Sequence, residues 1–164
     1  MNEEQLDKEF TEALEKEDEL GMAIKAHLDI EYWVNELLNI LLPYPEHLKP
    51  MELDYFGKIN LLCSLGLKSD YKAPLIYMGT TRNKFAHNLK YKIDKSVVNN
   101  FYKSFSEEGK ETAKRVYEST ERSEENKKYK SFREMNPKDQ FVFLAVNVRN
   151  MVKAAVYVAR NQSA

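Results

Sequence analysis

The chain has 164 residues, of which 43% are hydrophobic and 31% are charged, and its formal net charge is −1. Its 10 Tyr, 8 Phe and 1 Trp, with only 5 Gly and 5 Pro, exclude a disordered tail or a low-complexity linker. Uninterrupted apolar runs are short, and acidic residues stand where a secretion signal would be basic. We therefore expect no membrane span and no secretion signal. The single cysteine, Cys63, is typical of a small core residue in a reducing, cytoplasmic compartment.

Charge is distributed unevenly along the chain. Residues 1–20 contain nine acidic and two basic residues, which leaves a net charge of 23 − 17 = +6 on the other 144 residues. A mildly basic body could bind a polyanion, although a charge of this size is also normal for solvated protein surfaces.

Helical periodicity runs through the first part of the chain. Apolar residues lie four apart in the acidic segment 1–17, which predicts a short helix with one narrow apolar stripe. A longer core helix is predicted over 18–42, where apolar residues such as Leu20 and Leu28 recur at helical spacing until Pro43 ends the pattern.

Two further helices are predicted from their end signals. Asp54 is the expected N-cap of a helix that stops at Gly66, because a carboxylate accepts free backbone N–H groups and glycine allows a left-handed turn. Ser69 or Asp70 is expected to cap the next helix, for which Asn88 is the expected C-terminal residue.

The second half of the chain contains two more predicted helices around a polar segment. Asp94 opens the shorter helix, and Asn136 followed by Pro137 opens the last one. Between them, residues 106–134 hold eight acids and eight bases with few aliphatic side chains, which indicates an exposed helical or mobile insertion.

Long amphipathic helices, short connections and the lack of a convincing strand pattern together predict the fold class. We expect one all-α domain over residues 1–164, an antiparallel up-and-down bundle of four to five core helices with a polar insertion before the last helix.

Several chemistries lack their characteristic residues. The sequence has no glycine-rich phosphate loop, HExxH, CxxC or GxSxG motif. Its three histidines lie far apart and show no paired spacing for metal ligands. We therefore expect no metal site and no cofactor.

One stretch near the end of the helix before Asn88 combines Arg82, Asn83 and His87. The guanidinium of arginine offers a fixed fork of donors to a phosphate, and histidine exchanges protons near neutral pH. His87 could take the proton of a ribose 2′-hydroxyl or deliver one to the leaving 5′-oxygen, while Arg82 neutralises charge on the phosphoryl oxygens. Such chemistry would cut RNA to a 2′,3′-cyclic phosphate and would leave DNA intact.

The spacing of Arg82 and His87 qualifies this hypothesis. Five residues separate the two side chains by about 140° on a regular helix, so they do not share a face. They converge only if the last helical turn is loosened or if a second copy of the motif completes the site across a dimer interface. An arginine paired with an acid and a histidine capping helix carbonyls is the competing structural interpretation.

Three lysines, Lys84, Lys90 and Lys92, flank the motif. They could contact RNA phosphates, and exposed lysines are also favoured at a helix C-terminus by the macrodipole.

Segment 82–87, Arg-Asn-Lys-Phe-Ala-His, resembles the Arg-polar-x-x-x-His signature of the HEPN superfamily. Residues 58–67, KINLLCSLGL, are similar to the helix that precedes this signature in HEPN-like proteins of the mannitol operon repressor type. The resemblance implies a dimeric helical bundle whose two motifs face each other. It further implies that Arg82 and His87 form a catalytic pair and that Asn83 positions the histidine or the phosphate.

Two functional expectations follow from the resemblance. The first is a cytoplasmic, homodimeric, metal-independent endoribonuclease, acting as a toxin or defence component restrained by an antitoxin or regulatory protein. The alternative is a non-catalytic HEPN-like regulator that binds protein or nucleic acid through the same cleft. A structural helical domain, in which the motif merely packs, is the third interpretation.

Overall fold

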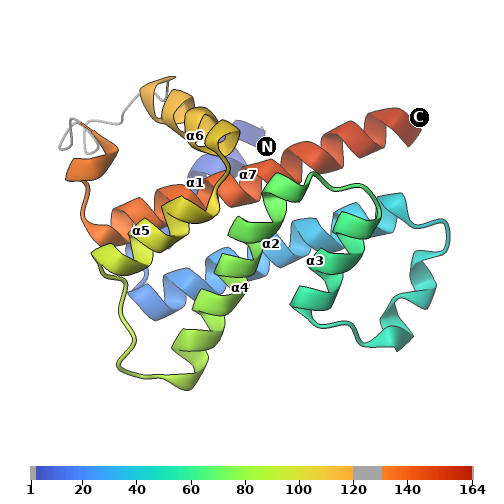
Figure 1. Cartoon of the computed structure of the whole chain (residues 1–164), viewed down its shortest axis with the longest axis horizontal. Helices are drawn as coiled ribbons and strands as arrows, with labels where there is room; N and C mark the ends of the chain where they lie inside the picture. The colour runs from blue at the N-terminus through green and yellow to red at the C-terminus, as the bar shows by residue number, and fades with distance from the viewer. Residues whose placement is uncertain (1–2, 120–130, 164) are drawn as a thin grey trace.

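The computed structural model describes residues 3–119 and 131–163 (Figure 1). Helices account for all regular secondary structure in these ranges, which confirms the predicted all-α class. The α-helices are α1 (Glu3–Lys16), α2 (Glu19–Leu41), α3 (Tyr55–Ser64), α4 (Lys72–His87), α5 (Lys95–Ser104), α6 (Glu107–Ser119) and α7 (Pro137–Ser163). Short 3₁₀ turns lie at Pro45–His47, Lys49–Met51, Ser69–Tyr71 and Phe132–Glu134.

The predicted signals start and end α3 as expected. Asp54 Oδ1 accepts a hydrogen bond of 2.8 Å from the backbone N–H of Gly57, which satisfies one of the free donors of the first turn. Gly66, just beyond the helix, has a φ of 103°, a conformation that glycine adopts without steric cost.

Side-chain caps also start α5 and α7. Asp94 Oδ1 accepts from the N–H of Val97 at 2.9 Å. Asn136 Oδ1 accepts from the N–H of Asp139 at 2.9 Å, and its Nδ2 donates to the Asp139 carboxylate at 2.7 Å. The predicted beginnings of both helices are therefore confirmed.

The start of α4 differs from the prediction that Ser69 or Asp70 caps it. A 3₁₀ turn occupies Ser69–Tyr71, and no side-chain hydrogen bond caps α4. The Lys72 N–H bonds instead to the Ser69 carbonyl. The chain is therefore already turning when α4 begins, and a backbone acceptor takes the place of the predicted side chain.

The two longest helices, α2 and α7, form the centre of the molecule (Figure 1). Along α7, Arg149 bonds to Asp29 of α2 at 2.5 Å, and Arg160 bonds to Glu36 at 3.0 Å. The partner that is later in α7 bonds to the residue that is later in α2, so the two helices run parallel. The predicted antiparallel order therefore does not extend to this pair. Short connections impose antiparallel packing only on consecutive helices, whereas segment 42–136 returns the chain to its starting end.

The core lies between α2, α3, α4, α5 and α7, and α1 adds Leu14 to it. These five helices match the predicted number of core helices. Leu28, which the sequence placed on the apolar stripe of α2, is instead 57% exposed, because the buried face of that helix is centred on neighbouring positions. The buried residues of α2 are Met22, Ala23, Ala26, His27, Ile30, Val34, Leu37 and Leu38.

The polar segment 106–134 contains α6, most of whose side chains are exposed, as predicted. Ala113 is an exception, because it is only 3% exposed. Residues 120–130 of this segment lie outside the described residues.

By length and composition, helix α7 could cross a membrane, with a mean hydropathy of 1.4 in its most apolar window. It is the one such helix in the ranges that the structure describes, and 56% of that window is buried inside the protein. A buried core helix meets the same criteria. Polar and charged residues interrupt the apolar sequence of α7, so it contains no long uninterrupted apolar run.

Candidate functional site

The predicted motif lies in the last two turns of α4. The helix continues through His87, and Asn88 ends it in an extended conformation with φ −143° and ψ 99°, as predicted. The side chain of Asn88 accepts a hydrogen bond of 3.0 Å from the N–H of Lys90, which stabilises the turn that follows. The last helical turn is therefore not loosened.

Arg82 and His87 are both exposed to solvent, and Asn83 is half-buried. Arg82 Nη1 donates to Asn83 Oδ1 at 3.1 Å. Over residues 3–119 and 131–163, Arg82 has no carboxylate partner within ion-pair distance, and the His87 side chain makes no hydrogen bond. The competing structural interpretation, with the arginine paired to an acid and the histidine capping carbonyls, is therefore not what this part of the chain shows.

Packing of Phe85 anchors the last turn of α4 between the two motif residues. Phe85 is only 5% exposed, and its ring meets that of Tyr91 edge-on with a centroid distance of 4.8 Å. The ammonium of Lys84 lies 5.6 Å from the centroid of the same Tyr91 ring. This anchoring fixes the directions in which Arg82 and His87 project.

The three lysines that flank the motif, Lys84, Lys90 and Lys92, are all exposed. None of them forms an ion pair with a carboxylate in the part of the chain that the structure describes. Together with Arg82 they add four positive charges at the C-terminal end of α4 and the loop after it, and such a concentration of charge attracts phosphate groups.

A second cluster of ionisable groups joins α2 to α3 and was not found from the sequence. The Glu31 carboxylate lies 2.8 Å from Lys58 Nζ and 3.6 Å from His27 Nε2. The His27 side chain is 7% exposed, and its ring packs on that of Tyr55 with a centroid distance of 4.4 Å. The only sequence signal was the i, i+4 spacing of His27 and Glu31, which many helices share.

Burial lowers the pKa of His27, because the charged imidazolium loses its hydration. The Glu31 carboxylate opposes this effect, while the positive charges of Arg82 and Lys58 lower the pKa further. Arg82 therefore acts electrostatically on His27 from α4, and the cluster borders the predicted motif.

Gly79 sets the close approach of α4 to α3, one helical turn before Arg82. A Cβ atom at this position would lie 2.7 and 2.8 Å from two ring carbons of Tyr55, which is closer than Cβ atoms approach other heavy atoms in proteins. The Tyr55 hydroxyl in turn donates to the Leu75 carbonyl of α4 at 3.0 Å. The motif is thus carried on a helix that is tied tightly to its neighbour.

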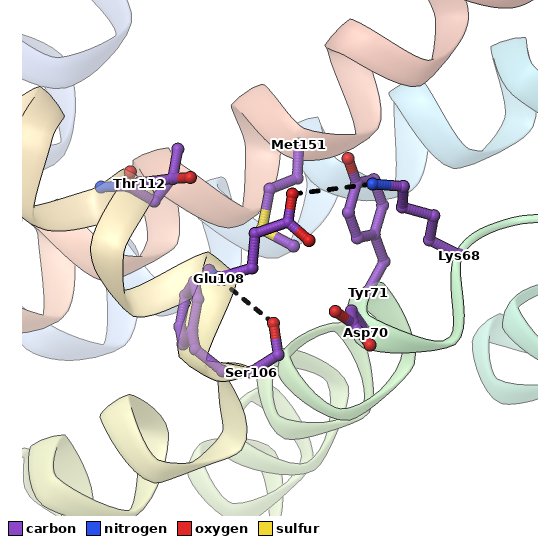
Figure 2. A pocket seen from close by; sticks show the side chains of 10 residues that line it. Lys68, Asp70, Tyr71, Ser106, Glu108, Thr112 and Met151 are labelled. Carbon is purple, nitrogen blue, oxygen red and sulfur yellow. Dashed lines mark hydrogen bonds and ion pairs between the residues drawn. The ribbon is translucent and has the colours of Figure 1, made fainter.

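A small pocket lies at the other end of α4, between the 3₁₀ turn that precedes that helix, α6 and α7 (Figure 2). Tyr71 and Met151 line it, and an ion pair of 3.7 Å joins Lys68 and Glu108 beside it. Its volume of about 80 Å³ is well below the roughly 300 Å³ at which ligand pockets begin. No residue of the predicted motif lines this pocket, so the candidate site is an exposed helix end and not a cavity.

The described residues contain no group of three or more His, Cys, Asp or Glu side chains that could hold a metal ion. Comparison with models of protein families, with curated proteins and with solved structures finds no match.

Proposed function

We propose that the protein is a HEPN-like, metal-independent endoribonuclease that acts through Arg82, Asn83 and His87. The observation that carries this proposal is that Arg82 and His87 stand exposed on a rigid helix end, where Arg82 has no carboxylate partner among the described residues. Both side chains are therefore available to a phosphate group in solution.

In the proposed reaction, His87 removes the proton from a ribose 2′-hydroxyl, and the resulting oxyanion attacks the adjacent phosphorus. The bond from phosphorus to the 5′-oxygen breaks, and a protonated histidine of the site returns a proton to that oxygen, leaving a 2′,3′-cyclic phosphate and a 5′-hydroxyl. Arg82 neutralises the negative charge that develops on the phosphoryl oxygens. The resemblance implies that Asn83 positions the histidine or the phosphate, and its hydrogen bond with Arg82 instead favours a role in positioning the guanidinium.

The regular geometry of α4 supports a homodimeric site. Because the helix continues without distortion through His87, the two side chains of one chain diverge by about 140°. A second motif facing the first could supply a histidine beside each arginine. In this arrangement Lys84, Lys90 and Lys92 bind the RNA backbone on either side of the scissile phosphate.

The test is to incubate the purified protein with structured and unstructured RNA and with DNA of matching sequence, in EDTA, and to analyse the ends of the products. We expect cleavage of RNA only, leaving a cyclic phosphate, and loss of cleavage in His87→Ala and Arg82→Ala. His47→Ala and Arg115→Ala are matched controls, because both residues are exposed and lie outside the motif. Persistent cleavage in His87→Ala would rule out this site.

The same assay separates the nuclease from the alternative, a non-catalytic HEPN-like regulator. A regulator would bind RNA or protein stoichiometrically, would leave RNA intact, and would keep its binding in His87→Ala. If the nuclease is a cytoplasmic toxin or defence component, an antitoxin or regulatory protein would restrain it by covering the exposed end of α4. A full-length complex with such a partner would then be inactive on RNA.

A further inference from the structure

Arg82 belongs to the inward face of α4. The buried residues Leu75, Met78 and Gly79 precede it by seven, four and three positions. Residues at these spacings share one face of a helix, so Arg82 is directed toward α2 and α3, on which α4 packs. Its side chain is nevertheless exposed, and Figure 1 shows the end of α4 extending past α2.

The carboxylate of Glu31 borders the same place from α2. Glu31 lies one turn after the buried His27, with Oε2 at 3.6 Å from the imidazole Nε2. The positive charge of Arg82 and the negative charge of Glu31 both act on this imidazole. Arg82 and Glu31 therefore approach one histidine from two helices, yet no ion pair joins these two described residues.

Lys58 of α3 is the cation that balances Glu31. Its Nζ lies 2.8 Å from Glu31 Oε1, and the two side chains are only 19% and 25% exposed. A carboxylate that has lost much of its hydration requires a positive partner. His27 does not supply this charge at neutral pH, because burial lowers its pKa.

With the Glu31 carboxylate occupied, Arg82 keeps only a neutral partner. Its Nη1 donates to the Asn83 amide oxygen at 3.1 Å. A guanidinium fits a carboxylate as well as a phosphate, since both anions present two oxygens to its fork of donors. Glu31 and a phosphate would therefore compete for Arg82 if Lys58 did not hold the carboxylate.

We propose that Lys58 is a positioning residue of the candidate site, which holds the Glu31 carboxylate and thereby leaves the Arg82 guanidinium free for a phosphate. Without the charge of Lys58, Glu31 takes Arg82 as its partner. The catalytic consequence rests on the nuclease function proposed above, whereas the pairing of Arg82 can be measured without RNA.

The first test measures the chemical reactivity of Arg82 in the absence of RNA. Phenylglyoxal condenses with arginine side chains, an ion pair protects a guanidinium from it, and mass spectrometry gives the rate at each arginine. We expect Lys58→Met to slow the modification of Arg82 about five-fold, the ratio that a partly exposed ion pair supports. Adding Glu31→Gln to the same chain should restore the wild-type rate, and the exposed Arg115 is the internal reference.

Matched variants separate this effect from a general loss of charge. Lys110 Nζ lies 2.6 Å from Glu107, and the Lys110 side chain is 21% exposed, close to the value for Lys58. Lys110→Met should therefore leave the Arg82 rate unchanged. Lys58→Arg keeps the charge beside Glu31 and should also give the wild-type rate. If circular dichroism shows that Lys58→Met does not fold, Lys58→Gln, whose amide can still donate to Glu31, takes its place and should slow Arg82 modification in the same direction.

The second test measures kcat/KM for RNA cleavage in the same variants. Lys58→Met should lower kcat/KM about five-fold, because Glu31 withdraws Arg82 from the phosphate, and Glu31→Gln in the same chain should restore it. A lysine that itself bound an RNA phosphate would cause the same loss in the single variant. That loss would persist in the double variant, and such a result would overturn the proposal.

The two tests distinguish a failure of this inference from a failure of the nuclease proposal. If the wild type leaves RNA intact, the nuclease proposal fails, while the modification rates still decide whether Lys58 keeps Arg82 free. Unchanged Arg82 modification in a folded Lys58→Met variant would overturn the inference, even if the wild type cleaves RNA. A slower rate that Glu31→Gln does not restore would also overturn it, because Glu31 would then not be the group that captures Arg82.

Discussion

Replacement of Asp7 by Asn tests the ion-pair cluster that attaches α1. The change keeps the size of the side chain and removes the charge that faces Arg149 and Lys153. Breaking a buried ion pair by removing one partner costs about 3–5 kcal/mol. Here the Asp7 side chain is 35% exposed and Arg149 keeps its bond to Asp29, so solvent and the second acid compensate part of the loss. We expect Asp7→Asn to lower the free energy of unfolding by about 2 kcal/mol.

Urea unfolding at pH 7, followed by circular dichroism, measures this loss directly. In a protein of this length, about 2 kcal/mol corresponds to a fall in melting temperature of roughly 4–8 °C. Lys8→Ala is the control on the same helix, because the Lys8 side chain is 72% exposed; it is expected to change the stability by less than about 0.5 kcal/mol. A loss in Asp7→Asn no larger than in this control would refute the reasoning.

The pH dependence of the same pair of proteins provides an independent check. Burial raises the pKa of Asp7, but hydrogen bonds from Lys153 and Arg149 outweigh it and hold the pKa below its ordinary value of 3.8. A carboxyl whose pKa is lowered by folding stabilises the protein above the unfolded pKa and loses that contribution as the pH falls through the folded pKa. The gap between wild type and Asp7→Asn should therefore be full at pH 7 and shrink below about pH 4. A gap that stays constant into strong acid would contradict the assignment.

Three further predictions concern the surroundings of the motif. Gly79→Ala drives a Cβ atom into the Tyr55 ring, and thermal melting should show a loss of about 1–3 kcal/mol. Folding lowers the pKa of His27 from 6.5, so the unfolded chain binds this proton more readily than the folded chain does. The free energy of unfolding should therefore fall as the pH drops through 6.5. In urea titrations at several pH values, His27→Gln should show a smaller change of stability with pH than the wild type. Arg82→Gln removes a charge that lowers the His27 pKa, so an NMR titration of the imidazole should give a higher value than in the wild type.

The ends of the helices could be predicted because their causes are local. Asp54 and Gly66 act on backbone groups within a few residues of themselves, and the structure contains both the cap and the left-handed turn. Asn88 ends α4 for a similar reason. The expected cap at Ser69 or Asp70 failed because a 3₁₀ turn, stabilised by backbone bonds alone, turns the chain before α4 begins. Side-chain preference predicts a cap only where the backbone leaves its donors free.

The packing of distant helices could not be predicted from the same patterns. Asp7 and Arg149 are separated by 142 positions, and Asp29 and Arg149 by 120. Periodicity shows that a helix has an apolar face, but it does not say which other helix that face meets or in which direction the partner runs. For the same reason the sequence suggested neither the parallel pairing of α2 with α7 nor the burial of Arg149 and Lys153.

The residues of the candidate site could be predicted from a local signal, but their arrangement in space depends on packing. Arg82 and His87 were found from the sequence because one segment of α4 carries them, and their spacing on a helix already predicted that they diverge. In the structure Phe85 is buried and α4 remains regular through His87. No local distortion of the helix therefore turns the two side chains toward each other. Within one chain, α4 directs Arg82 and His87 about 140° apart around the helix axis, away from a common phosphate. We therefore expect the proposed reaction to require a second copy of the motif, so that catalysis depends on dimerisation.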